Sequence, residues 1–233
     1  MTLTGLLLAA PFPGVRSRGR RGMLGLWSRG VCRLLRVRIR VEGAIPPRPF
    51  LLVSNHLGYL DIPVLAAAAP SRFVAKSEVR EWPGIGNLAR AAGTIFVNRR
   101  SPRDALRTTE ALGAAIADGE SVIIFAEATS SPGERVLPFR PALLEWAART
   151  AYPVHYASLH YRTPPGGPPA HEAVCWWGDM TFMGHLPGLA RLPWIEATVR
   201  FGASPVQEGE RRALAARLHR AVADQFTPVV SES

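Results

Sequence analysis

One histidine and one aspartate, five residues apart, are the side chains of this sequence best suited to acid–base chemistry. His56 follows the apolar run FLLVS at 50–54, and Asp61 ends the segment NHLGYLD. On an ideal helix this spacing separates two side chains by about 140°, but in a turn that contains glycine they can converge. A carboxylate on one imidazole nitrogen would fix the tautomer and leave the other nitrogen as a general base. Asp61 could also simply cap a helix at 62–69, and the two roles are compatible.

Two further segments carry polar side chains next to predicted strands. The segment GTIFVNRR (93–100) ends in Arg99 and Arg100, which are suited to bidentate anion binding or else form a solvated surface pair. In the segment FAEATSS (125–131), Glu127 follows the most apolar strand, so it is either a site residue or a helix cap. Ligands of open α/β sheets bind beyond the strand ends, so these loops and the His56 loop are candidates for one site.

The apolar pattern predicts the elements that position these loops. Strands are predicted at 35–41, 50–54, 72–76, 94–98, 121–126, 153–159, 172–177 and 194–201, and helices at 62–69, 102–118, 140–150 and 207–225. Such alternation predicts an α/β protein: a single domain with a largely parallel or mixed central sheet flanked by helices.

Length and composition exclude several classes of protein. The chain has 233 residues, of which 47% are hydrophobic and 20% charged, so a disordered or fibrous protein is excluded. Its two cysteines exclude a disulfide scaffold and a Cys-rich zinc site. No metal-ligand spacing of His, Cys and acidic residues is present, so we expect no metal.

The basic charge is concentrated at the N-terminus. Residues 1–40 hold nine arginines and no acidic residue, whereas the remainder is nearly neutral, which argues against nucleic-acid binding. The apolar stretch 3–10 is short, and its charge follows rather than precedes it, which excludes a signal peptide. Residues 23–35, with Trp27, have the pattern of a basic amphipathic helix. We therefore expect residues 1–34 to be a membrane-associating arm, peripheral or monotopic at the cytoplasmic face; the alternatives are a frayed extension or a helix packed on the body.

Taken together, the three segments resemble the glycerolipid acyltransferase family, whose best-known members are the 1-acylglycerol-3-phosphate acyltransferases. NHLGYLD, GTIFVNRR and FAEATSS stand in the family's order and spacing, and VLPFR (136–140) and Pro153-Val154 resemble the family's stretches after the third block. The resemblance covers roughly residues 35–205. It implies a glycerol-3-phosphate acyltransferase-like domain there, followed by a C-terminal helix and tail at 206–233.

The resemblance also implies a mechanism and a set of site residues. His56 would take the proton of a lysolipid hydroxyl, Asp61 would orient His56, and the alkoxide would attack an acyl thioester of acyl carrier protein or coenzyme A. No covalent enzyme intermediate, metal or other cofactor is implied. Arg99 would hold the acceptor's phosphate, and Glu127 would either help to bind the acceptor or order the loop. The positions implied in substrate binding are Asn55, Gly93, Arg99, Arg100, Glu127, Thr129 and Ser130.

The third block departs from the family pattern, which usually reads Phe-Pro-Glu-Gly-Thr followed by Arg-Ser. Ser130 removes a phosphate donor, and Ala128 adds a methyl group where the backbone either approaches the ligand or needs a positive φ. A branch similar to the lyso-ornithine lipid acyltransferases tolerates such variants, and WWGDM at 176–180 also resembles that branch. The expected acceptor is 1-acyl-sn-glycerol-3-phosphate, giving phosphatidic acid, and lyso-ornithine lipid is the alternative.

A different class of function is also open. The alternatives are a hydrolytic protein and a lipid-binding protein without transfer activity, and the altered third block would fit the lipid-binding protein. A serine hydrolase would need a nucleophile, and the sequence has no Gly-x-Ser-x-Gly elbow.

Overall fold

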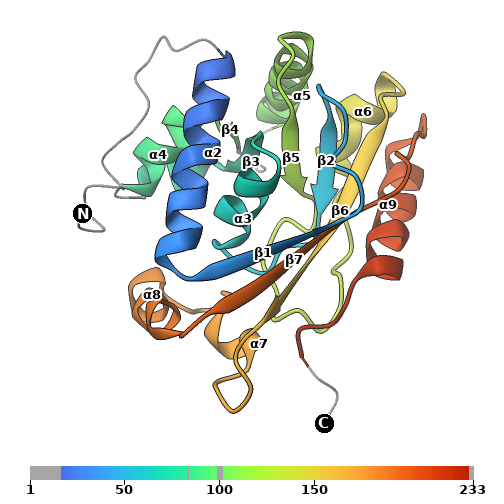
Figure 1. Cartoon of the computed structure of the whole chain (residues 1–233). Helices are drawn as coiled ribbons and strands as arrows, with labels where there is room; N and C mark the ends of the chain where they lie inside the picture. The colour runs from blue at the N-terminus through green and yellow to red at the C-terminus, as the bar shows by residue number, and fades with distance from the viewer. Residues whose placement is uncertain (1–16, 83, 99–101, 231–233) are drawn as a thin grey trace.

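The structure is a computed structural model that describes residues 17–82, 84–98 and 102–230. Its centre is a seven-stranded sheet in the order β1-β7-β6-β2-β5-β3-β4 (Figure 1). Every neighbouring pair is parallel except β6 and β7, so β1 and β7 run against the other five strands. The strands are β1 (Val37–Glu42), β2 (Leu51–Ser54), β3 (Arg72–Lys76), β4 (Ile95–Val97), β5 (Val122–Phe125), β6 (Val154–Arg162) and β7 (Ile195–Phe201).

Helices cover both faces of the sheet, which confirms the predicted α/β class. One face packs against α2 and α3, and the other against α5, α6 and α9. The helices are α2 (Ser17–Leu34), α3 (Asp61–Ala68), α4 (Ile85–Ala91), α5 (Pro102–Ala117), α6 (Glu145–Arg149), α7 (Ala170–Ala173), α8 (Phe182–Arg191) and α9 (Arg211–Gln225), with 3-10 turns η1 (Ser77–Glu81) and η2 (Pro141–Leu144). The sequence patterns did not predict α4 or α8.

The two central strands place the polar loops side by side. All residues of β2 and β5 are buried, as expected for parallel strands covered on both faces. Their register pairs Ser54 with Phe125 at the carboxyl ends. His56 and Glu127 each follow one of these ends by two residues, so the sheet brings the first and third sequence blocks together.

The predicted strand at 172–177 is wrong. Its residues begin inside the short helix α7 and continue as irregular chain. The β-branched and aromatic composition favours a strand, but β6 and β7 pair directly with each other and leave no place between them. The backbone N–H of Trp176 instead donates a single hydrogen bond to the carbonyl of Leu57. This segment therefore lies over the loop that follows β2.

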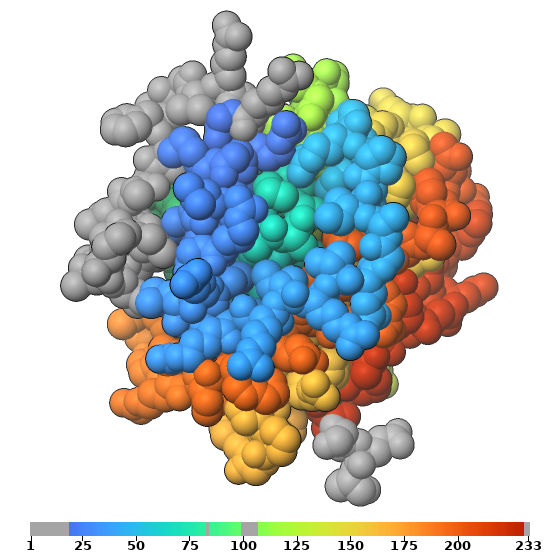
Figure 2. Space-filling view, viewed as in Figure 1, coloured from blue at the N-terminus to red at the C-terminus, as the bar shows by residue number. Residues whose placement is uncertain are grey.

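Helix α2 belongs to the basic N-terminal segment and is packed on the body. Leu24 and Cys32 are buried in the core, and a Cβ on Gly25 would lie 2.8 Å from Pro70, so α2 crosses α3 closely. Figure 2 shows α2 and the chain after β1 on either side of the segment that contains α3. Within the described part of the chain, no helix combines the length and apolarity needed to cross a bilayer. The apolar stretch 3–10 lies outside the described residues.

Candidate active site

The structure brings His56 and Asp61 into direct contact. His56 lies in the loop after β2, and Asp61 is the first residue of α3. Nδ1 of the imidazole is 2.7 Å from Oδ2 of the carboxylate. Because the carboxylate is an acceptor, Nδ1 carries the hydrogen and Nε2 presents a lone pair. The His56 side chain is 21% exposed, so the pair is a buried carboxylate behind an imidazole that reaches solvent.

Asp61 is fully buried, and its carboxylate is surrounded by donors. Besides His56, Oδ2 accepts the backbone N–H groups of Leu57 at 2.6 Å and Gly58 at 3.0 Å. Oδ1 accepts the hydroxyl of Tyr161 at 2.8 Å. These donors precede α3 or come from β6, so Asp61 fixes the His56 loop and does not act as a conventional helix cap. Charge-assisted hydrogen bonds of this kind stabilise a carboxylate away from water.

The third block holds His56 from three directions. Oε1 of Glu127 accepts the backbone N–H of His56 at 3.1 Å, and the N–H of Ser131 donates to its carbonyl at 3.0 Å. The ring of Phe125 stacks on the imidazole with centroids 4.0 Å apart. Rotation of the imidazole is thus restrained by packing as well as by Asp61. This supporting role of Phe125 was not predicted from the sequence.

Glu127 orders the His56 loop, which is one of the two roles that the family resemblance implies for it, and its help in binding the acceptor stays a prediction. Its side chain is buried, and its carboxyl accepts the N–H groups of His56 and Leu137. Burial raises the pKa of Glu127 to about 8, an effect opposed by those two hydrogen bonds and reinforced by nearby Asp61. The carboxyl is therefore mostly protonated at neutral pH.

We predict that Glu127→Gln changes the pH dependence of stability. The raised pKa means that Glu127 favours the folded state fully below pH 4.5, and that this contribution is lost as the pH rises through about 8. Glutamine keeps the acceptor oxygen and has no proton to lose. The variant should gain stability relative to the parent as the pH rises, by an amount of the order of a few kcal/mol.

Urea unfolding between pH 4 and 9 checks this prediction, with Glu134→Gln as the matched control. Glu134 is an exposed glutamate in the same loop, so its replacement should leave the pH dependence unchanged. A constant difference between Glu127→Gln and the parent at all pH values would contradict the prediction.

Asn55 anchors the start of the His56 loop, and its predicted part in substrate binding stays a prediction. Its side chain is buried, with Oδ1 accepting the N–H of Leu159 at 2.7 Å and Nδ2 donating to the carbonyl of Leu159 at 3.1 Å. Both polar ends of the amide are thereby bound to the backbone of β6. The start of the His56 loop is tied to this strand in the manner of a sheet ladder.

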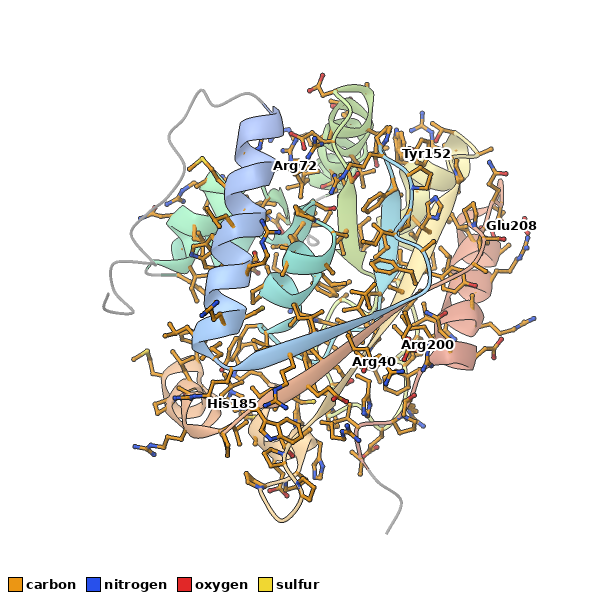
Figure 3. The ribbon with its side chains drawn as sticks, viewed as in Figure 1. Arg40, Arg72, Tyr152, His185, Arg200 and Glu208 are labelled. Carbon is orange, nitrogen blue, oxygen red and sulfur yellow. The ribbon has the colours of Figure 1, made fainter. Side chains whose placement is uncertain are left out.

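The structure does not bring Gly93 to His56. Gly93 precedes β4, at the amino end of strands whose carboxyl ends carry the His56 loop. It has a φ of 74°, and its carbonyl accepts Nε of Arg72. Figure 3 shows Arg72 at the end of the molecule opposite His185, which lies beside the His56 loop. The predicted anion-binding residues Arg99 and Arg100 lie outside the described residues.

Thr129 and Ser130 lie in the loop that contacts His56. Thr129 is exposed and Ser130 half-buried, and the next residue, Ser131, binds the His56 carbonyl. Their small hydroxyl groups are thus available at the edge of the site.

Ala128, three residues after the end of β5, has a φ of 67°. Of the two alternatives expected from its place in the third block, close approach to the ligand or a positive φ, the structure shows the second. A residue with a Cβ atom is strained in this conformation by about 1 kcal/mol. We predict that Ala128→Gly raises the free energy of unfolding by about 0.5–1 kcal/mol, and Tm by about 2–4 °C.

Calorimetry measures this effect, and Ala126→Gly is the matched control. Ala126 is fully buried and has an ordinary φ, so glycine there should lower Tm. A fall in Tm for Ala128→Gly would mean that its methyl group stabilises more than its backbone strain costs.

An aromatic wall, which the sequence did not predict, covers the outer side of the loop. The ring of Tyr59 meets Trp176 and Phe182, and its hydroxyl is 2.8 Å from Nδ1 of His185. A Cβ at position 58 would lie 2.9 Å from the backbone nitrogen of Trp176, so the close approach of this wall requires Gly58. Within residues 17–82, 84–98 and 102–230, no group of three or more His, Cys, Asp or Glu side chains is arranged to hold a metal ion.

Comparisons with known proteins place this geometry in a wider context. The family model described as Acyltransferase matches residues 36–158. A lyso-ornithine lipid O-acyltransferase of Brucella abortus is 36% identical over 226 residues, which cover 91% of this chain and 84% of that protein. One from Rhizobium meliloti is also 36% identical, over 197 residues that cover 78% of this chain and 66% of that protein.

Two other relatives carry a different name. A 1-acyl-sn-glycerol-3-phosphate acyltransferase of Neisseria meningitidis is 32% identical over 166 residues, covering 70% of this chain and 65% of that protein. The crystal structure of the 1-acyl-sn-glycerophosphate (LPA) acyltransferase PlsC from Thermotoga maritima matches with a TM-score of 0.63 and 23% identity, covering 95% of this chain and 87% of that chain. This second likeness is one of fold.

Proposed function

This chain belongs to the Acyltransferase family, and on this basis we propose that it moves a fatty acyl group from a thioester to the free hydroxyl of a lyso-ornithine lipid. The thioester is that of acyl carrier protein or coenzyme A. Both groups of named relatives are acyltransferases of lysolipids, so the acceptor's head group is the finer part of the proposal.

In the proposed reaction His56 is the general base. Its Nε2 takes the proton of the acceptor hydroxyl while Nδ1–H stays bound to Asp61. The hydroxyl oxygen attacks the thioester carbonyl carbon, the carbon–sulfur bond breaks, and the proton on Nε2 passes to the departing thiolate. The products are an ester and a free thiol. Asp61 stabilises the imidazolium that exists between the two proton transfers.

The observation that carries the choice of acceptor is the extent of the Brucella abortus match. That lyso-ornithine lipid O-acyltransferase aligns over 226 residues at 36% identity, whereas the Neisseria meningitidis glycerophosphate enzyme aligns over 166 at 32%. The order of preference expected from the sequence is therefore reversed. Ser130, in place of the usual arginine, supports the same choice because it removes a phosphate donor. An ornithine head group carries a carboxylate, which Arg99 is proposed to bind.

The basic segment 1–34 is proposed to hold the enzyme at the cytoplasmic membrane surface, where a lysolipid resides. Helix α2 exposes the apolar Met23 and Leu26 together with Arg29 and Arg33. Apolar side chains flanked by arginines favour the interface of an anionic leaflet, with each arginine contributing about 1 kcal/mol. Residues 35–205 would then form the catalytic unit, and residues 206–233 would form the C-terminal helix and tail that follow it.

An acceptor competition tests the proposed function. Membranes containing the protein receive labelled acyl-CoA or acyl carrier protein, with lysophosphatidate and lyso-ornithine lipid offered in parallel and His56→Ala as the control. We expect label in ornithine lipid that depends on His56. Label in phosphatidate alone would replace the proposed acceptor with lysophosphatidate, and label in neither would overturn the proposal.

A further inference from the structure

Tyr161 is a buried tyrosine that no sequence block contains. It lies on β6, is 1% exposed, and its hydroxyl donates to Oδ1 of Asp61 at 2.8 Å. The two residues are 100 positions apart in the chain, and β6 adjoins the strand that leads into the His56 loop.

The contacts of Asp61 divide between its two oxygens. Oδ2 takes His56 and the backbone N–H groups of Leu57 and Gly58, all within the loop. Among the described residues, the donor to Oδ1 is Tyr161. Rotation about the Cβ–Cγ bond would move both carboxylate oxygens. The bond from Tyr161 to Oδ1 opposes that rotation together with the three bonds at Oδ2, and so helps to fix where Oδ2 meets the imidazole.

β6 holds the loop at both ends, once through its backbone and once through a side chain. Leu159 binds the amide of Asn55 through its backbone N–H and carbonyl, and Tyr161, two residues further along the strand, binds Asp61 through its hydroxyl. The loop between Asn55 and Asp61 is therefore held at both ends by one rigid strand.

Among the titratable groups that act on the Tyr161 hydroxyl, Asp61 is the one that carries a charge. Cys32 from α2 and Cys175 from the chain after α7 are the other titratable neighbours. Burial raises the pKa of Cys32 to about 12 and also raises that of Cys175, so both thiols stay neutral. Burial, followed by the nearby Asp61, holds the pKa of Tyr161 well above its usual range. On the far side of Asp61 stand His56 and the mostly protonated Glu127.

We propose that Tyr161 is a positioning residue for the acyl transfer, acting through Asp61 to set the orientation and basicity of His56. This proposal rests on the proposed function, because it assigns His56 the role of base. Tyr161 touches neither substrate. Its hydroxyl draws electron density from the carboxylate, and its loss should make Asp61 a stronger acceptor and His56 a stronger base in a less defined position.

Tyr161→Phe is expected to lower kcat by about 10- to 100-fold and leave KM for both substrates within about twofold. The acid limb of the pH profile of kcat should move to higher pH. Tyr152→Phe is the matched control, because Tyr152 lies before β6 and donates its hydroxyl to Pro49 at the other end of the strand (Figure 3). It should change neither kcat nor the pH profile.

Two further measurements separate positioning from folding. In an Asp61→Asn background, Tyr161→Phe should cost little more activity, because the charge it acts through is already gone. Placing 3-fluorotyrosine at 161 keeps the ring and makes the hydroxyl a stronger donor. The acid limb should then move to lower pH, opposite to the shift in Tyr161→Phe, and this variant serves even where phenylalanine impairs folding.

The titration of the His56 imidazole, followed by NMR in the free enzyme, gives a readout that needs no acceptor. Its midpoint should fall in the order phenylalanine, tyrosine, fluorotyrosine at position 161. Identical midpoints in the three proteins, or a loss of kcat with an unmoved pH profile, would overturn the positioning role. Failure of the parent enzyme to acylate any lysolipid would overturn the proposed function alone, since the titration series stands without it.

Discussion

His56→Ala is expected to lower acyl transfer by about 10²- to 10⁴-fold, the usual contribution of a general base. Nε2 of His56 is the proton acceptor that the geometry offers, because Nδ1 is bound to Asp61 at 2.7 Å. The loss should appear in kcat, measured with labelled acyl thioester under saturating acceptor. Stability should fall by only about 1 kcal/mol, from the lost contact with the Phe125 ring.

A second histidine provides the control for this prediction. His155 lies on β6 with its ring against Phe50, at the other end of the strand from the loop. His155→Ala should keep near-normal kcat even where it lowers stability. If His56→Ala retained more than about a tenth of the parental kcat, His56 would not be the base.

Replacements of Asp61 should separate its charge from its hydrogen bonds. Asp61→Ala leaves four donors without an acceptor inside the protein, those of His56, Leu57, Gly58 and Tyr161. Unpaired buried donors cost about 1–3 kcal/mol each, so we expect the free energy of unfolding to fall by at least about 4 kcal/mol.

Asp61→Asn should fold nearly as well as the parent and still lose most of its activity. The amide oxygen can accept from the three donors on the Oδ2 side, and the amide nitrogen can donate to the hydroxyl oxygen of Tyr161. The negative charge opposite the imidazolium is gone, so we expect kcat to fall by about 10²- to 10³-fold.

Denaturant unfolding and kcat, measured together on both Asp61 variants, check this pair of predictions. Asp118→Asn, at the end of α5, is the control and should be neutral. If the alanine and asparagine variants lost equal stability, the predictions would be contradicted, because the charge of Asp61 and not its hydrogen bonds would then be the source of stability. An active Asp61→Asn enzyme would show that the charge is dispensable.

Much of the fold could be predicted because its elements are local. The buried strands β2 and β5 read as continuous apolar runs, and β7 alternates buried and half-buried residues. The strand predicted at 172–177 failed because its composition suits a strand but the sheet has no place for it. Composition reports the preference of a segment, whereas strand pairing depends on the other segments present.

The candidate site likewise has one part that the sequence predicted and another that only the folded structure revealed. The amino-acid sequence was sufficient to predict the order of the three blocks and the His56–Asp61 pair, because a short loop allows two side chains five residues apart to meet. Apart from Glu127, for which ordering of the loop was one of two implied roles, the residues that support this pair could be identified only in the folded chain. Asn55 and Glu127 turn inward to hold backbone, and Gly93 lies at the opposite end of the sheet.

Tyr161 is the furthest of these supports along the chain, since it reaches Asp61 across 100 residues. Its contact follows from the strand order β6-β2-β5, which places β6 beside the strand that leads into the His56 loop. The strand order is set by the packing of the whole chain, so it cannot be predicted from the hydrophobic periodicity of any one segment. Local patterns therefore predict the His56–Asp61 pair, and the long-range pairing of strands determines what holds it in place.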